Sequence, residues 1–240
     1  MTPFYQHNGI TIYCGDCLEV LPTLSSIDSL IADPPYGINS VTKSGETFTT
    51  SNAAKTTKNH KPVIGDDKKF NPAHLLSFPK VALFGANHYS KHLPSSSCWL
   101  VWDKRDGINS NTMADCELVW TNIDSPSRLF HHTWMGMIRA SKDERVHPNQ
   151  KPVVVMRWVI NQVSPDGAIC DPYMGSGTTL RAAQDMGLQA VGIELDEEYC
   201  QIAVQRLRQQ SFSFPARATN KSLKPNYSQS ELLTPKASED

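Results

Sequence analysis

The stretch that decides the fold is CDPYMGSGTT, residues 170–179, which joins an apolar segment to a helical one. The segment GAIC (167–170) predicts a strand, and SGTTLRAAQDM (176–186) predicts a helix. The glycines at 175 and 177 allow a tight turn and let a ligand approach the backbone and the free amides of the helix start. The pattern indicates an α/β unit with a ligand at its turn.

The same rhythm continues with a strand QAVGI (189–193), then Glu194, then a helix DEEYCQIAVQRLRQQ (196–210). Alternating strands and helices indicate a parallel sheet covered by helices. An acid such as Glu194 at a strand end can accept hydrogen bonds from ribose hydroxyls. A dinucleotide GxGxxG motif would need glycine where Leu180 stands, and no Walker motif follows. We therefore favour a site for a different nucleoside cofactor over a turn without a ligand.

Further apolar runs before this unit predict additional strands. They are ITI (10–12), SLIA (29–32), VALFG (81–85), CWLVW (98–102) and CELVW (116–120). The segment VVVMRWVINQV, which follows Pro152, predicts a helix. These elements predict an α/β fold in residues 1–210, with one mostly parallel, twisted sheet flanked by helices.

A second motif, DPPYG (33–37), stands where two prolines end the apolar run 29–32. Proline fixes φ and donates no hydrogen bond, so nearby carbonyls remain as acceptors beside the Asp33 carboxylate and the flat Tyr36 ring. Such a set can hold an NH2 group on an aromatic ring, with Tyr36 on the ring face. On this motif alone, a proline-rich turn with a surface tyrosine is an equally good interpretation.

Composition places the chain among globular proteins. Of 240 residues, 39% are hydrophobic, and 23 Lys and Arg face 24 Asp and Glu for a net charge of -1, which excludes disorder of the whole chain. The six cysteines are scattered, and Cys14 and Cys17 have no second pair at ligand spacing, so we expect neither disulfides nor a metal site. The sequence lacks an apolar run of about 18 residues and a signal peptide, which predicts a cytoplasmic protein without a membrane partner.

A neutral chain can bind nucleic acid only through local positive charge. Two segments offer it, 38–62 with four Lys and one acid, and 128–151 with five Lys or Arg and two acids. Segment 38–62 is rich in Ser and Thr, and we expect a mobile loop there. The candidate DNA-binding residues are Lys43, Lys55, Lys58, Lys61, Arg128, Arg139, Lys142 and Arg145.

Three further expectations concern the remaining parts of the chain. Segment 106–145 is the candidate target-recognition region, and it is so short that specificity requires a homodimer or is relaxed. Segment 211–240 is polar and broken by prolines, so we expect a disordered tail. Asp103 and Lys104 are expected to form an ion pair, with a role in a base pocket as the alternative.

Taken together, the motifs resemble the S-adenosylmethionine-dependent amino-methyltransferases of DNA. The residues that carry this resemblance are GDC (15–17), DPPYG (33–37), HPNQKP (147–152), DPYMGSGTT (171–179) and GIELDEEY (192–199). The catalytic tetrapeptide precedes the cofactor motif, as in the permuted beta class of that family. The resemblance spans residues 10–207 and implies a single Rossmann-like methyltransferase domain with S-adenosylmethionine as its cofactor.

The resemblance also implies roles for individual residues. The catalytic residues would be Asp33, Pro34, Pro35 and Tyr36. Residues implied at the cofactor are Asp16, Asp33, His147, Lys151, Asp171, Pro172, Tyr173, Gly175, Ser176, Gly177, Thr178 and Glu194. Asp16 would lie near the adenine, 171–177 around the methionine moiety and sulfonium, and Glu194 at the ribose. His147 and Lys151 would begin the segment that closes the pocket. Tyr173 stands where Phe is more usual, so its hydroxyl needs a partner.

The reaction that the resemblance implies is methyl transfer to the exocyclic nitrogen of a base flipped out of double-stranded DNA. An Asp at the start of the tetrapeptide goes mostly with adenine N6 and a Ser with cytosine N4, so Asp33 favours adenine. Cytosine N4 is the alternative, followed by methylation of RNA or of a protein glutamine, which goes with Asn. A non-catalytic DNA-binding module is the rival outside enzymes. The sequence does not indicate whether a cognate restriction nuclease accompanies this protein.

Overall fold

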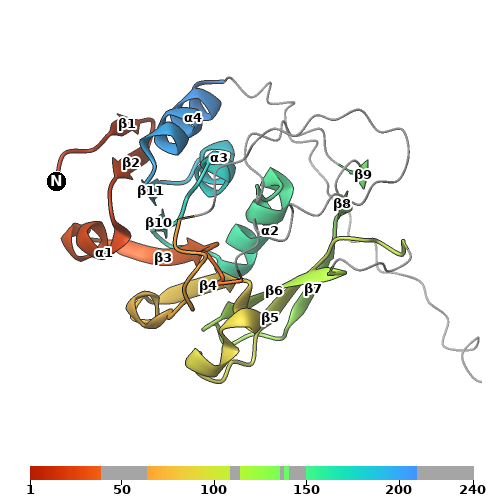
Figure 1. Ribbon diagram of the computed structural model, residues 1–240. Coiled ribbons are helices and arrows are strands. Elements are labelled where there is room, and N and C mark those ends of the chain that lie inside the picture. The colour runs from red at the N-terminus through yellow and green to blue at the C-terminus, as the bar shows by residue number, and fades with distance from the viewer. Residues whose placement is uncertain (39–63, 109–113, 136–137, 141–149, 210–240) are drawn as a thin grey trace, which may run out of the picture. The chain divides into compact units, whose positions relative to one another are not determined.

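The computed structural model describes residues 1–38, 64–108, 114–135, 138–140 and 150–209, and a single large sheet dominates this part of the chain (Figure 1). Its nine strands have the order β1-β2-β11-β10-β3-β4-β6-β5-β7, and β8 pairs with β9 separately. The strands are β1 (Tyr5–His7), β2 (Ile10–Cys14), β3 (Ile27–Ala32), β4 (Lys80–Phe84), β5 (Trp99–Asp103), β6 (Cys116–Thr121), β7 (Arg128–His131), β8 (Trp134–Met135), β9 (Ile138–Arg139), β10 (Ala168–Asp171) and β11 (Ala190–Glu194).

Five adjacent strands, β2, β11, β10, β3 and β4, are parallel to one another. Strand β6 runs antiparallel to both β4 and β5, and β1 runs antiparallel to β2, so the sheet is mostly parallel, as the sequence predicts. Four strands, β1, β7, β8 and β9, are not among the strands predicted from the sequence. Strands β1 and β7 are edge strands of three and four residues whose side chains are mostly exposed, so no buried apolar run marks them. Strands β8 and β9 have two residues each.

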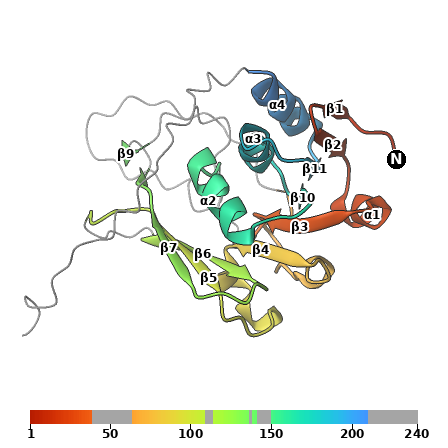
Figure 2. The same ribbon diagram turned by 180° about the vertical axis from the view of Figure 1, so that it is seen from behind.

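Helices cover both faces of the sheet (Figures 1 and 2). They are α1 (Cys17–Val20), α2 (Val153–Val163), α3 (Thr178–Asp185) and α4 (Glu197–Arg208), with short 3-10 helices η1 (Leu21–Thr23), η3 (Ala73–Leu75), η4 (Ala86–His88) and η5 (Ser90–His92). Side chains alternate along each strand, so Ile31 packs in the layer of α2, α3 and α4, whereas Leu30 and Ala32 pack in the layer of α1. The three predicted long helices are confirmed.

The parallel arrangement brings the carboxyl ends of β2, β11, β10, β3 and β4 to one edge of the sheet. Since β5 lies antiparallel to β6, the end of β5 and the start of β6 reach the same edge. This edge is where ligands bind in open α/β sheets. The sequence motifs 15–17, 33–37 and 171–177 all follow strands that end there.

Several predicted segments lie wholly or mostly outside the described residues. The loop 38–62 is described at residue 38 alone, and the tail 211–240 is not described. Within 106–145, β6 and β7 belong to the central sheet, which leaves fewer residues for target recognition. In the described part of the chain, no helix is both long and apolar enough to cross a membrane.

The start of α3 depends on Gly177, whose φ is +77° and whose missing Cβ would lie 2.8 Å from the Ala203 Cβ of α4. Gly177→Ala should therefore lower the free energy of unfolding by about 2–4 kcal/mol, from the left-handed backbone and from the clash together. Gly187→Ala is a matched control, because Gly187 has φ +70° but an added Cβ there would have no atom within 4 Å. Urea denaturation measures both. Equal losses in the two variants would contradict the packing argument.

Candidate active site

Asp33 and Tyr36 follow β3 and contact each other directly. The Tyr36 hydroxyl donates to Asp33 Oδ1 over 2.5 Å, and the Lys151 ammonium donates to Asp33 Oδ2 over 2.7 Å. Lys151 also lies 3.4 Å from the Tyr36 hydroxyl oxygen. Each carboxylate oxygen of Asp33 thus has one donor, one from its own motif and one from the residue before Pro152.

The Tyr36 ring is held by close backbone contact. Gly85, directly after β4, has φ +65°, and a Cβ there would lie 2.2 Å from the Tyr36 ring. His88 stacks on Tyr36 with ring centres 5.2 Å apart. The backbone after the motif is fixed by Asp66, whose carboxylate accepts from the Gly37 N–H over 2.9 Å. Gly85, His88 and Asp66 are absent from the sequence prediction, because their contacts join segments far apart in the chain.

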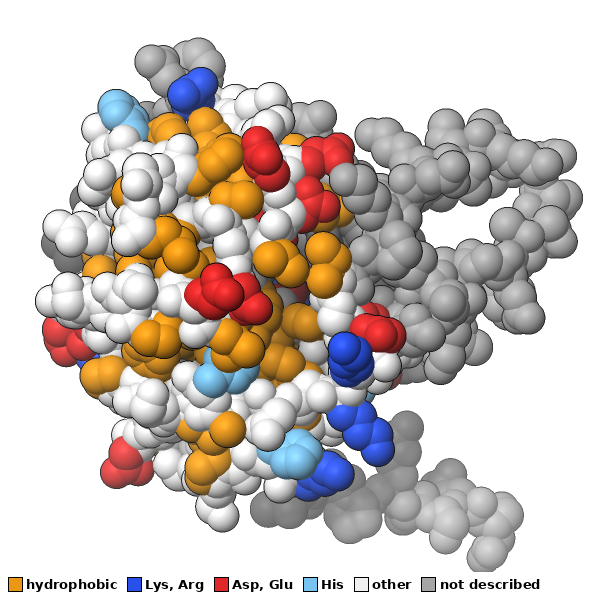
Figure 3. Space-filling view, turned by 60° about the vertical axis from the view of Figure 1, so that its left-hand side comes forward, with side chains coloured by type: hydrophobic (Ala, Val, Ile, Leu, Met, Phe, Trp, Pro, Cys, Tyr) orange, Lys and Arg blue, Asp and Glu red, His pale blue; other side chains and the backbone are white. Residues whose placement is uncertain are grey.

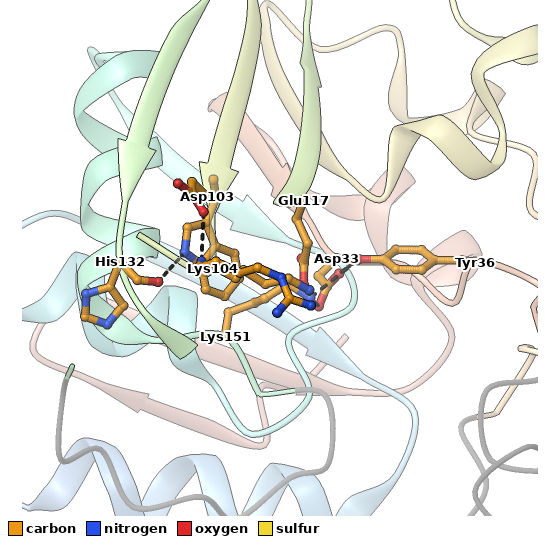
Figure 4. A network of polar contacts seen from close by, with 9 residues as sticks. Asp33, Tyr36, Asp103, Lys104, Glu117, His132 and Lys151 are labelled. Atoms are coloured by element: carbon orange, nitrogen blue, oxygen red, sulfur yellow. Dashed lines mark hydrogen bonds and ion pairs between the residues drawn. The ribbon is translucent and has the colours of Figure 1, made fainter. Parts of the chain in front are cut away.

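Four charged side chains form a continuous cluster at this edge (Figure 4). Lys151 Nζ lies 3.3 Å from Glu117 Oε2, and Lys104 Nζ lies 3.2 Å from Glu117 Oε1. The expected ion pair between Asp103 and Lys104 is therefore wrong. Strand β5 places Asp103 on the side of β7, where its carboxylate lies 2.9 Å from His131 Nδ1, while Lys104 turns to Glu117 on β6.

The protonation of this cluster follows from burial and from its charges. Burial raises the pKa of Asp33 and Glu117 adds to the rise, whereas Lys151 opposes it. Burial alone would lower the pKa of Lys151, but the Asp33 and Glu117 carboxylates outweigh it and hold this pKa above its usual value. Burial and the same two carboxylates raise the pKa of Tyr36, so its hydroxyl stays a donor. Asp33 is thus a carboxylate of increased basicity beside a permanent cation.

The glycine turn after β10 contains a second buried carboxyl group. Asp171 Oδ1 accepts from the Tyr173 N–H over 3.1 Å, and its Oδ2 accepts from the Thr179 hydroxyl over 2.5 Å. The pKa of Asp171 is raised to about 7, mainly by burial, while the nearby charges of Asp33 and Glu194 add to this rise and the two hydrogen bonds oppose it. This carboxyl group would be stabilised in its ionised form by a cation.

Two other acids lie near the glycine turn, Glu194 beside Asp171 and Asp16 near Tyr173. Glu194, at the end of β11, accepts from the Gly175 N–H over 3.0 Å and from the Asp196 N–H over 2.9 Å. Asp16, after β2, caps α1 by accepting from the Leu18 N–H over 2.8 Å. Gly175 has φ +50°, and a Cβ added to it would meet no atom of the described residues within 4 Å, so this part of the chain leaves space above the turn. Carboxylates around an open glycine turn suit a ligand with cationic and hydroxyl groups.

The other predicted cofactor residues have defined places. Pro172 is buried, and the side chains of Ser176 and Thr178 are buried against α4, where both contact Arg206. The Tyr173 hydroxyl has the partner that the sequence requires, since it lies 2.9 Å from His74 Nε2. His147 lies outside the described residues.

Most predicted DNA-binding residues lie outside the described part of the chain. Arg128 is exposed at the start of β7, and only the backbone of Arg139 is described, in β9. On the face seen in Figure 3, acidic and hydrophobic side chains occupy the middle, and the described Lys and Arg lie at the margins. This face therefore offers no broad basic surface among the described residues.

The fold is that of an α/β protein in which a glycine turn bordered by carboxylates adjoins the buried Asp33 carboxylate. Comparison with known proteins agrees. The family model for N6/N4 DNA methylases matches residues 41–205, more than half of the chain. The type II methyltransferase M.ScaI of Streptomyces caespitosus is 26% identical, covering 88% of this chain and 85% of its own. The chain belongs to the N6/N4 DNA methylase family, and its methyl donor is S-adenosylmethionine.

Solved structures show the same fold. The cytosine-N4-specific PvuII DNA methyltransferase has a TM-score of 0.56 at 14% identity, covering 88% of this chain and 90% of its own. M1.HpyAVI in complex with SAM has a TM-score of 0.50 at 20% identity, covering 82% of this chain and 100% of its own. The Rossmann-like methyltransferase fold predicted from the sequence is confirmed, as are the family and the cofactor.

The raised pKa of Asp171 predicts how stability depends on pH. The folded protein keeps this proton up to pH about 7, whereas an unfolded carboxyl group loses it near pH 4. Relative to Asp171→Asn, the free energy of unfolding of the wild type should fall by about 1.4 kcal/mol for each pH unit within that window. Urea denaturation of both proteins from pH about 4.5 to about 8 measures this difference. Parallel stability curves would refute a titrating, buried Asp171.

Proposed function

We propose that this chain methylates the exocyclic N6 of adenine in double-stranded DNA, with the target base flipped toward Asp33 and Tyr36. The single observation that carries the proposal is the position of Asp33 at the end of β3, directly beside the glycine turn that follows β10. The choice of adenine is supported by Asp33 itself, because the family resemblance associates an Asp at the start of this tetrapeptide mostly with adenine.

The residues around the glycine turn fit S-adenosylmethionine. Asp171 and the backbone of 173–177 would hold the methionine part, Glu194 the ribose hydroxyls and Asp16 the adenine. A sulfonium and an ammonium beside Asp171 would compensate for the cost of ionising that buried carboxyl group. When bound, the cofactor would supply an electrophilic methyl group, and the electron pair of the broken S–C bond would remain on its sulfur.

Asp33 acts on the nitrogen that receives the methyl group. Hydrogen bonds from the NH2 to the Asp33 carboxylate and the Pro34 carbonyl would orient its lone pair for attack. The new N–C bond uses that lone pair, and the nitrogen then loses one proton, which Asp33 accepts directly or through water. Burial raises the pKa of Asp33, which makes it a better acceptor for this proton.

Tyr36 and Lys151 complete the arrangement. The Tyr36 ring offers a flat surface for the flipped base, and its hydroxyl fixes one oxygen of Asp33. Lys151 keeps Asp33 ionised, since an isolated carboxylate in this buried position would take up a proton. We propose this role for Lys151 in addition to its expected place at the start of the segment that closes the cofactor pocket.

The proposed reaction can be tested directly. The protein is incubated with methyl-labelled S-adenosylmethionine and DNA duplexes, the DNA is digested to nucleosides, and the labelled base is identified. We expect label in N6-methyladenine, and none when Asp33→Ala is used, while that variant still binds the cofactor. Label in N4-methylcytosine would reassign the base, and label in protein or RNA alone would overturn the proposal.

Removal of the Lys151 charge should shift the pH dependence of methyl transfer. In Lys151→Met the pKa of Asp33 rises because its nearest cation is lost, so the rate at neutral pH falls by at least tenfold and recovers as the pH increases. Rates from pH about 6 to about 9.5 with saturating cofactor measure the shift. Lys80→Met is the control, since Lys80 pairs with Asp166 at the opposite end of β4. A low rate without alkaline recovery would contradict this role.

A further inference from the structure

The Lys151 ammonium is shared between two carboxylates. Its nitrogen lies 2.7 Å from Asp33 Oδ2 and 3.3 Å from Glu117 Oε2, and its side chain is only 10% exposed. These residues come from the end of β3, the start of β6 and the residue before Pro152, so three distant segments meet at one cation (Figure 4). The proposed catalysis uses Asp33 and Lys151 but gives no role to Glu117.

Both oxygens of Asp33 already accept a hydrogen bond, one from Tyr36 and one from Lys151. An amino group that approaches Asp33 must share these acceptors. A lysine with Asp33 as its single anion would be held there tightly, because charge-assisted hydrogen bonds are strong when shielded from water. A second anion that also attracts the ammonium would weaken this competition.

Glu117 is arranged to be that second anion. Lys104 holds Oε1 at 3.2 Å, which fixes the direction of the carboxylate. Oε2 is buried, and although the Lys151 nitrogen is 3.3 Å away, no donor stands in hydrogen-bonding geometry to it among the described residues. A small movement of the Lys151 ammonium toward Glu117 would therefore form a hydrogen bond to Oε2 in exchange for its hydrogen bond to Asp33.

We propose that Glu117 is a positioning residue of the active site, which draws the Lys151 ammonium partly away from Asp33 so that Asp33 can accept from the target amino group. The proposal rests on the proposed function. Glu117 acts through Lys151. The two ammonium groups and two carboxylates of the cluster have a net charge of zero, which reduces the free-energy cost of burying them.

The surroundings of Asp33 determine the sign of the expected effect. Lys151, Tyr36 and Glu117 face it directly, Lys104 acts through Glu117, and Asp171 and Tyr89 lie near enough to interact with its charge. In Glu117→Gln a negative charge is lost and Lys151 turns fully to Asp33. Both changes lower the pKa of Asp33. Asp33 then stays ionised, but its hydrogen bond from Lys151 is stronger, so the target amino group competes less well for its oxygens.

The first test measures Asp33 without any need for catalysis. The protein is labelled with 13C-aspartate, the Asp33 carboxyl signal is assigned through Asp33→Asn, and the signal is titrated in the wild type and in Glu117→Gln. We expect a lower titration midpoint in Glu117→Gln, and a wild-type midpoint in Glu197→Gln, an exposed control in the first turn of α4. An unchanged midpoint in Glu117→Gln overturns the inference.

The second test measures methyl transfer. In Glu117→Gln we expect kcat to fall about tenfold, equivalent to ~1.4 kcal/mol, with the acid limb of the pH profile moved to lower pH and the cofactor KM unchanged. If the wild type methylates DNA but the acid limb of Glu117→Gln is unchanged, the inference is overturned and the proposed function still holds. If the wild type transfers no methyl group, the proposed function fails and the titration still decides the role of Glu117.

A third variant covers the case in which Glu117→Gln does not fold. Glu117→Asp keeps the charge but withdraws the carboxylate from Lys151, so both the Asp33 midpoint and kcat should lie below those of the wild type. Thermal melting of each variant shows whether it is folded. Wild-type values of both quantities in folded Glu117→Asp overturn the inference.

Discussion

The parallel pairing of β3 with β10 is the constraint on which the site depends. It aligns Cys170 with Leu30, so Asp171 and Asp33 leave the sheet at the same edge although the chain separates them by most of its length. One strand ends at the carboxylate for which we propose the catalytic role, and the other leads into the glycine turn that we propose for the cofactor. The order of motifs along the sequence is therefore of no consequence to the site, provided that these two strands lie side by side.

This pairing concentrates negative charge, and the protein compensates for it unequally. On the catalytic side, Lys151 and Lys104 balance Asp33 and Glu117 within the chain. On the side of the glycine turn, the partners of Asp171 among the described residues are a hydroxyl and a backbone amide, and burial is the main cause that raises its pKa to about 7. In the proposed function, a cationic group of the methyl donor would balance it. The charges beside Asp33 are thus compensated within the chain, whereas we propose that those beside Asp171 are compensated by the ligand.

Local patterns predicted the parts of the site that are local. The glycine turn and the tetrapeptide follow strands and have distinctive spacing, so 171–177 and 33–36 could be placed from the sequence. The contacts of Glu117 and Lys104 could not, because they depend on the antiparallel pairing of β5 and β6. The signal available was an acid inside the apolar run CELVW, since a charge in such a strand requires a buried partner. Strands β1 and β7 escaped prediction because they are short and their side chains are mostly exposed.

The burial of Lys151 also changes the charge argument for DNA binding. The segment 128–151 has five Lys or Arg and two acids, but Lys151 is committed to two carboxylates and cannot contact a phosphate. The charge that this segment can offer to a duplex is therefore lower by one than its composition suggests. The salt dependence of DNA binding reflects the number of phosphate contacts. A lysine that is buried in an ion pair makes no such contact, so the net charge of its segment overestimates the number of phosphates that the segment can bind.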